Sequence, residues 1–225
     1  MKNNRILGIL FSAAMTMTLV SCGGDAKLEK AYISFVTAGE NIAVFEKVYD
    51  GKAAEFDLKG VKTNSDGELS LTWYAFETVK EGEEEKQVEK KLDAAPVDGG
   101  SYQIAVSVPK TKKFDERTVK HDFTITKAPL PETAVTRKSE FPSVIHYTET
   151  GSGSRITRRA VEADVTLAKA NVEVKIGNKT LVADTDYSVT VSIANATKAN
   201  VAINLINNSN YSGLTFQVDA AKQTA

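Results

Sequence analysis

The chain has 225 residues and a nearly balanced charge, with 28 Lys and Arg against 29 Asp and Glu. This balance argues against nucleic-acid binding, which uses a clustered basic surface. One cysteine and two histidines are too few for a zinc site built from His and Cys, and the lone cysteine cannot form an internal disulfide.

The first 21 residues have the layout of a secretory signal peptide. Lys2 and Arg5 open the chain, and residues 6–20 carry no charge. This apolar run is shorter than the ~20 residues that a helix needs to cross a bilayer. We therefore expect residues 1–21 to be a signal peptide that is removed on export.

The apolar run ends in Leu19-Val20-Ser21-Cys22, which contains the only cysteine. This tetrapeptide resembles the lipobox of bacterial lipoproteins. The resemblance implies a lipid on the Cys22 sulfur, cleavage before Cys22 and acylation of the new amino terminus. The expected location is the cell envelope, in the outer membrane of a Gram-negative bacterium, with residues 22–30 as a lipidated flexible tether. The alternative is an ordinary signal peptide with a chance cysteine.

From Ala31 onward, apolar residues alternate with polar ones at a period of two. Val, Ile, Thr and aromatic residues dominate these runs, as in half-buried β-strands. The clearest runs are residues 101–108, 121–126, 172–176, 187–193 and 201–205. Turn signals such as Asp50-Gly51 separate them. The pattern predicts an all-β protein of the sandwich type.

The length after residue 21 is too great for one sandwich of ~100 residues and suits two. Ala128-Pro129-Leu130-Pro131 is the predicted boundary, because two prolines cannot continue a strand ladder. We expect four segments beyond the tether: a first sandwich over 31–128, a linker over 129–132, a second sandwich over 133–219 and a tail over 220–225.

Two segments interrupt the alternation. Residues 80–91 are nearly all charged with mixed signs. They are expected to form a solvated hairpin tip, with a charged recognition loop as the alternative. Residues 150–154, Thr-Gly-Ser-Gly-Ser, are expected to be a hairpin loop inside the second sandwich.

Several motifs resemble the MBG-type and related Ig-like repeats of bacterial surface proteins. In the first half these are Tyr49-Asp50-Gly51, residues 95–102 and the closing run over 123–128. In the second half, residues 177–181, 186–189 and 210–213 resemble a sister repeat. The likeness covers residues 31–219, although residues 133–159 lack the usual opening turn. It implies two tandem Ig-like β-sandwiches, a spacer or adhesion role and no catalytic residue.

Aromatic residues offer one candidate site. Trp73, Tyr74 and Phe76 lie on one predicted strand, where alternation puts Trp73 on one face and the other two on the opposite face. An outward-facing aromatic pair would be a stacking platform for sugars, whereas a Trp73 packed in the core is the alternative.

Charged residues offer two more candidates. The second half contains a basic stretch around the loop over residues 150–154. One interpretation is that it contacts acidic glycans or lipid headgroups, and the alternative is a solvated strand face. The basic stretch comprises Arg137, Lys138, Arg155, Arg158 and Arg159. Asp184 and Asp186 are expected to cap a turn, because a full set of oxygen ligands for calcium does not follow.

Together these observations predict a non-enzymatic cell-envelope lipoprotein that acts in surface adhesion or ligand binding. Catalytic residues, cofactors and metals are not expected. The expected partners are a membrane, through Cys22, and a glycan or protein ligand. The alternatives are a carbohydrate-binding component of a polysaccharide-capture system, a structural spacer, and a hydrolase with convergent carboxylates.

Overall fold

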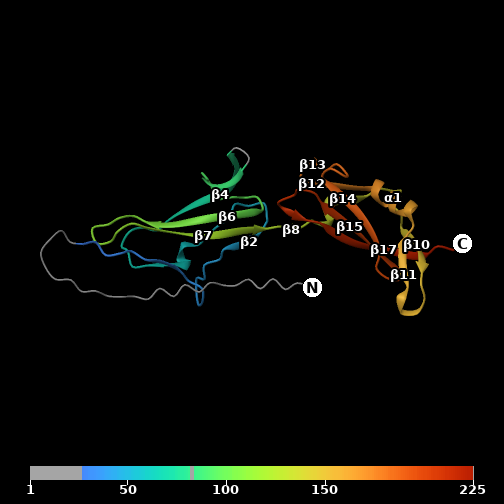
Figure 1. The fold of residues 1–225 in the computed structure, drawn as a ribbon, viewed down its shortest axis with the longest axis horizontal. Helices are drawn as coiled ribbons and strands as arrows, with labels where there is room; N and C mark the ends of the chain where they lie inside the picture. The colour runs from blue at the N-terminus through green and yellow to red at the C-terminus, as the bar shows by residue number, and fades with distance from the viewer. Residues whose placement is uncertain (1–26, 82–83, 225) are drawn as a thin grey trace.

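The computed structural model describes residues 27–81 and 84–224. Strands dominate this part of the chain, which contains one α-helix, so the predicted all-β class is confirmed. Figure 1 shows two bodies of β-sheet arranged end to end. The buried apolar side chains form one cluster among residues 31–125 and another among residues 130–220. We refer to residues 27–126 as the first unit and to residues 128–224 as the second unit.

The first unit has a five-stranded sheet and a two-stranded sheet. The larger sheet has the order β2, β7, β6, β4, β5, and only β2 runs parallel to its neighbour. Its strands are β2 (Glu46–Val48), β7 (Arg117–Thr126), β6 (Gly100–Val108), β4 (Ser70–Glu81) and β5 (Glu84–Lys91). The smaller sheet pairs β1 (Ile33–Phe35) with β3 (Val61–Thr63), which follows a 3-10 turn, η1 (Leu58–Gly60).

The core of the first unit lies between these sheets. Alternation along β6 buries Ile104, Val106 and Val108 almost completely. Ile33 and Val61 from the smaller sheet belong to the same cluster. The predicted strand over residues 101–108 is therefore confirmed, and residues 121–126 form the second half of β7.

The second unit also pairs a large sheet with a small one. The large sheet has the order β11, β10, β17, β15, β14, and β10 runs parallel to β17. Its strands are β11 (Thr157–Ala160), β10 (Val144–Thr150), β17 (Leu214–Lys222), β15 (Lys198–Leu205) and β14 (Tyr187–Ile193). The small sheet contains β13 (Lys179–Thr180), β12 (Val172–Ile176) and β9 (Val135–Arg137), and a 3-10 turn, η2 (Glu132–Ala134), precedes β9.

The predicted strands of the second unit coincide with observed ones. Residues 172–176 and 187–193 are β12 and β14, and residues 201–205 end β15. The expected hairpin loop over residues 150–154 falls in the connection from β10 to β11, residues 151–156, which contains a third 3-10 turn, η3 (Gly153–Arg155). The region without the usual opening turn, residues 133–159, contains β9, which pairs with β12, and β10, which pairs with β11 and β17.

The helix α1 (Glu162–Ala170) was not predicted. Its sequence is rich in helix-forming Glu, Ala, Leu and Lys, but its N-cap, Val161, makes no side-chain capping bond. Tertiary contacts hold it instead. Ala168 is fully buried, and the Asp164 carboxylate accepts a hydrogen bond from the His146 N–H at 2.6 Å. A helix of this length without capping signals cannot be recognised from local sequence.

Two predicted boundaries need correction. The expected linker includes Leu130, which is 1% exposed and belongs to the core of the second unit. The expected tail begins at residue 220, but β17 continues to Lys222 because Ala220 and Lys222 pair with β10. Hydrophobic alternation is weak around Leu130 and after residue 219, so burial and strand pairing are needed to assign both segments to the second unit.

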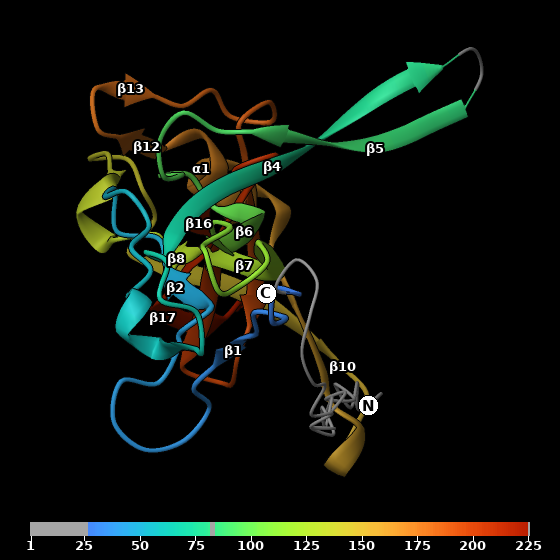
Figure 2. The ribbon, with the colours of Figure 1, turned by 90° about the vertical axis from the view of Figure 1, so that its left-hand side faces the viewer.

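The charged residues 80–91 form a hairpin, as predicted, although β4 and β5 continue to Glu81 and from Glu84. Figure 2 shows this hairpin extending away from the body of the first unit. Lys90 pairs with Glu77 at 2.6 Å and Lys80 with Glu85 at 3.6 Å. Each exposed pair contributes little stability, and the mixed charges keep the edge strand β5 soluble.

We expect Ile104→Ala to lower the free energy of unfolding of the first unit by about 2–5 kcal/mol, because it leaves a cavity in a close-packed core. Trp73 is the only tryptophan, so its fluorescence during urea unfolding reports the first unit. The matched variant Ile145→Ala, in the second core, should leave the Trp73 transition nearly unchanged. Equal losses in both variants would contradict two separate cores.

Candidate functional site

Cys22 and the signal peptide lie outside the described residues, so lipidation remains a prediction from the sequence. In the described part of the chain, no helix combines the length and the apolar character needed to span a membrane.

The proposed aromatic platform does not include Trp73. The Trp73 side chain is buried, and its ring meets Phe123 edge to face at 4.9 Å in the core of the first unit. Tyr74 and Phe76 lie on the opposite face of β4. The Lys120 ammonium lies 4.8 Å from the centre of the Tyr74 ring and pairs with Glu89, so it covers part of this ring. Phe76, 37% exposed, is the more open of the two rings.

Asp184 and Asp186 lie in a turn, as predicted, but in the described residues only Asp186 caps it with its side chain. The Asp186 carboxylate accepts a hydrogen bond from the Val182 N–H at 2.9 Å, and Asp184 has a positive φ of 62°. Over residues 27–81 and 84–224, no three His, Cys, Asp or Glu side chains are grouped to hold a metal ion.

Both histidines have structural contacts. His146 Nδ1 lies 2.8 Å from an Asp164 carboxylate oxygen, which joins β10 to α1. The His121 ring stacks on Phe45 with 3.6 Å between ring centres. Neither arrangement resembles a base beside a nucleophile.

The basic stretch is divided by the fold. Arg155, Arg158 and Arg159 belong to the hairpin of β10 and β11, whereas Arg137 ends β9 and Lys138 follows it. Arg158 is paired with Glu149 at 2.9 Å, and the Arg137 guanidinium lies 5.3 Å from the centre of the Phe216 ring.

The junction between the two units brings together three of the turn and loop motifs that the sequence singled out. Its backbone link is a parallel pairing of β8 (Ala128–Pro129) with β16 (Tyr211–Ser212). The Ala128 N–H donates to the Asn210 carbonyl at 2.9 Å, and the Ser212 hydroxyl donates to the Ala128 carbonyl at 3.2 Å. The segment that leaves the first unit is therefore bound into the second.

Asn210 makes the central side-chain contacts of the junction. Its Oδ1 accepts a hydrogen bond from the Gly99 N–H at 2.6 Å, and its Nδ2 donates to the Asp98 carboxylate at 3.0 Å. Asn208 Oδ1 accepts from the N–H groups of Asn210 and Tyr211, at 3.0 and 2.7 Å, and so fixes the loop that presents Asn210. One amide thus bridges residues more than a hundred positions apart in the chain.

Close packing accompanies these bonds. Gly99 is buried against the second unit, and a Cβ at this position would overlap the Ser209 carbonyl oxygen. The Tyr49 and Tyr211 rings meet edge to face at 5.2 Å. Burial raises the pKa of the Tyr49 hydroxyl, and Tyr211 and Asp98 raise it further. Tyr49 is therefore neutral at physiological pH and contributes an apolar contact.

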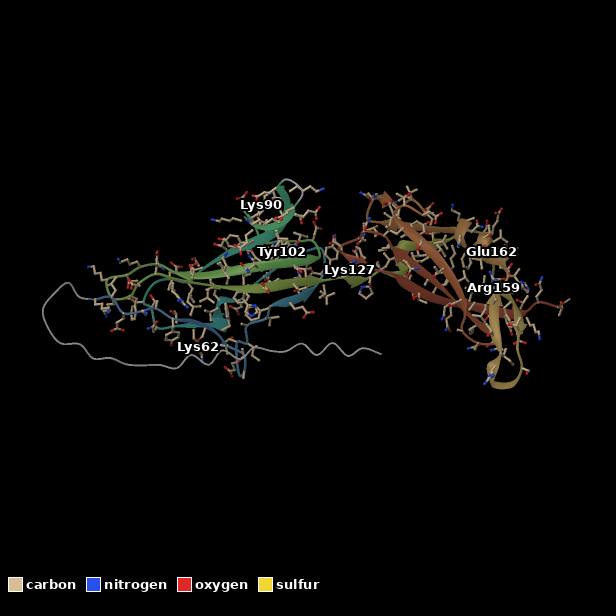
Figure 3. All side chains as sticks on the ribbon, viewed as in Figure 1. Lys62, Lys90, Tyr102, Lys127, Arg159 and Glu162 are labelled. Atoms are coloured by element: carbon tan, nitrogen blue, oxygen red, sulfur yellow. The ribbon has the colours of Figure 1, made fainter. Side chains whose placement is uncertain are left out.

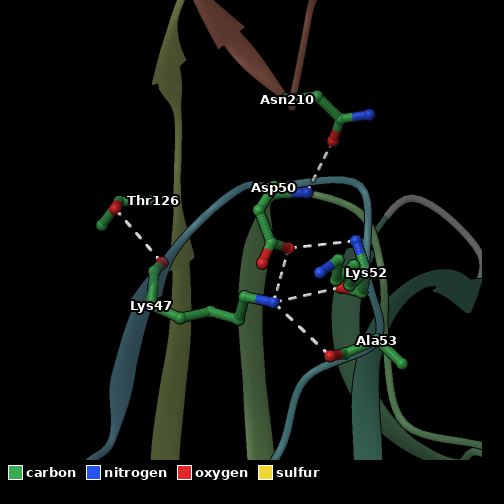
Figure 4. Close-up of polar contacts among 7 residues, drawn as sticks. Lys47, Asp50, Lys52, Ala53, Thr126 and Asn210 are labelled. Atoms are coloured by element: carbon green, nitrogen blue, oxygen red, sulfur yellow. Dashed lines mark hydrogen bonds and ion pairs between the residues drawn. The ribbon is translucent and has the colours of Figure 1, made fainter.

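The turn that carries Tyr49 is braced by Lys47 (Figure 4). The Lys47 ammonium donates to the Asp50 carboxylate at 2.7 Å and to the Lys52 and Ala53 carbonyls at 3.1 and 3.4 Å. The hydrogen bond from Lys47 lowers the pKa of Asp50, which stays ionised. Lys47 thereby fixes the conformation of the turn that the first unit contributes to the junction.

The resemblance motifs Tyr49-Asp50-Gly51, Asp98-Gly99 and Asn210-Tyr211 thus meet at one place. The sequence singled out each of them as part of a repeat-like motif, but it carried no signal that motifs from the two halves would contact one another. No protein-family model matches the chain, and comparison with curated proteins finds no match. The family assignment therefore remains a prediction from the residues.

A second cluster of charges ties together β10, β11 and β17 at the other end of the second unit. The Glu149 carboxylate pairs with Lys222 at 2.8 Å and with Arg158 at 2.9 Å. The hydrogen bond from Lys222 lowers the pKa of Glu149, and the charge of Arg158 lowers it further. The same contact raises the pKa of Lys222.

We expect Gly99→Ala to loosen the junction, because the added methyl group displaces the Ser209 carbonyl and the Asn210 contact. A chain without Cys22 has no cysteine, so spin labels placed by Lys62→Cys and Glu162→Cys report the separation of the units (positions labelled in Figure 3). Pulsed electron paramagnetic resonance should show a narrow distance distribution that broadens in Gly99→Ala. Gly100→Ala, whose added Cβ has only ordinary contacts, is the control.

We expect the second unit to lose stability in acid through Glu149. Because the pKa of Glu149 is lowered in the folded chain, its ion pairs stabilise the fold fully at pH values above its ordinary pKa of 4.5. This stabilisation is lost as the pH falls through the lowered pKa. The deficit of Glu149→Gln in melting temperature, measured at pH 7, should therefore shrink below pH ~4. Glu140→Gln, which removes an exposed carboxylate of the same unit, should show no such pattern.

Proposed function

We propose that this protein is a non-enzymatic, lipid-anchored component of the bacterial cell envelope. In this proposal its two Ig-like units form a rod that presents a ligand-binding surface away from the membrane, in adhesion or in ligand capture. The observation that carries the proposal is the junction, because hydrogen bonds and ring packing between the units favour one extended arrangement over free motion.

The path of the chain supports this direction of presentation. Glu29 is bound to the loop before β7, with its N–H donating to the Lys113 carbonyl and its carbonyl accepting from Asp115. From that loop, β7 runs for 10 residues, about 30 Å, and ends beside the junction. Glu29 therefore already belongs to the first unit, so the expected tether over residues 22–30 would have to end before it. Such a tether would meet the first unit at the end far from the second unit, which would become the membrane-distal part.

Strand pairing supports a relationship between the two units. In the large sheet of each unit, the last strand has two neighbours. One is an early strand that runs parallel to it, and the other is the strand that precedes it in that sheet, which runs antiparallel. The pairs are β2 with β7 and β10 with β17. This shared arrangement supports the proposal that the units are tandem repeats of the Ig-like type predicted from the motifs. A structural spacer without a ligand is the simpler form of the same function.

The anchor is tested in bacteria that produce the full chain with an alkyne-labelled fatty acid. We expect label on the protein and, by mass spectrometry, an acylated amino terminus at Cys22. Cys22→Ser should abolish both, whereas Ser21→Ala, which keeps a small residue before the cleavage point, should retain them. An unlabelled mature chain beginning at another residue would contradict the anchor.

A further inference from the structure

An open groove of about 420 Å³ lies on the second unit, where the segment after β9 crosses the ends of β15 and β17. Its lining combines basic, polar and apolar side chains and comprises Arg137, Lys138, Phe141, Pro142, Ser143, Lys198, Gln217, Val218 and Asp219. The volume is within the range of small-molecule sites, about 300–1,000 Å³.

Positive charge predominates in this groove. Lys198 pairs with Asp219 at 2.7 Å, so these two charges compensate each other. Arg137 and Lys138 form no ion pair with any residue that the structure describes. Both side chains belong to exposed residues. The groove therefore carries two uncompensated positive charges.

Contacts within the second unit position the Arg137 side chain and the Lys138 backbone. The Arg137 guanidinium rests over the Phe216 ring, and Phe216 packs against Phe141 with 6.0 Å between ring centres. The Lys138 N–H donates to the Asn171 carbonyl, and the Lys138 carbonyl accepts from the Phe141 N–H. The half-buried Phe141 and Pro142 add apolar surface beside the charges.

We propose that this groove binds an acidic glycan, with Arg137 and Lys138 contacting carboxylate groups of uronic acid residues. A planar guanidinium suits bidentate contact with a carboxylate. Gln217 and Ser143 offer polar groups for sugar hydroxyls, and Phe141 offers a ring for the apolar face of a sugar. The proposal deepens the proposed function by naming the ligand class of the presented surface.

The position of the groove favours a glycan over the headgroups of the protein's own membrane. The junction lies just before the start of β17, whereas Val218 and Asp219 lie at the middle of this strand, about 15 Å further along, and Asp219 pairs with Lys198 at the start of β15. The groove is thus on the half of the second unit away from the first, and the anchor would enter at the opposite end of the first unit.

The test uses residues 23–225, which contain every described element but lack the lipid, so its result does not depend on Cys22. Isothermal titration with an oligogalacturonate should show saturable binding that weakens as salt is raised from 20 to 300 mM, because exposed charges are screened. A fully methyl-esterified oligomer of the same length, which lacks the charges, should bind much more weakly. Lys138→Glu should weaken binding of the acidic oligomer at least about tenfold.

Two further variants separate the groove from general positive charge. Arg137→Gln with Lys138→Gln should abolish binding, whereas Arg155→Gln with Arg159→Gln, which removes the same charge from the hairpin of β10 and β11, should leave it unchanged. Circular dichroism melting confirms that each variant is folded. Lys138→Glu keeps the Arg137 contact with Phe216, so it remains informative if the double variant is unstable.

Absence of saturable binding in 20 mM salt would overturn the proposal, as would equal binding by the wild-type chain and Lys138→Glu. Binding to phosphatidylglycerol vesicles without binding to the oligogalacturonate would also overturn it and would assign the groove to a lipid surface. None of these results bears on acylation of Cys22, so failure of the groove and failure of the anchor are distinguishable.

Discussion

The extended form of this protein depends on the contacts of Asn210. Its amide accepts from the Gly99 N–H and donates to the Asp98 carboxylate, while the backbone beside it pairs with Ala128. Two units joined by a short segment are expected to move relative to one another unless their interface is specific. Here a bifunctional side chain, a buried glycine and an edge-to-face tyrosine pair supply that specificity over a small area.

Each unit is stabilised mainly by its own apolar core, because the chain has one cysteine and no internal disulfide is possible. The surface charges have other roles. Mixed signs along β4 and β5 discourage pairing of the exposed edge with another chain. Glu149, held between Lys222 and Arg158, adds ion pairs between β10 and both of its neighbouring strands. Stability and solubility are thus assigned to different sets of residues.

The surfaces available for binding arise from the way strands meet. The outward face of β4 presents Phe76, but Lys120 covers part of the Tyr74 ring. On the second unit, Arg137 ends a strand of the small sheet, Lys138 follows it, and Lys198 and Gln217 belong to the large sheet; they share a groove because the segment after β9 lies beside β15 and β17.

The sequence by itself determined the strands and turns, because alternation and turn residues act locally. Residues 172–176 and 187–193 were predicted to the residue, and the loop over 150–154 was placed correctly. Alternation also separated Trp73 from Tyr74, but it could not say which face is buried, since that depends on what packs against the sheet. Only the tertiary structure decided the short helix α1, the burial of Leu130 and the contact of Asn210 with Asp98, because these rest on interactions between residues far apart in the chain.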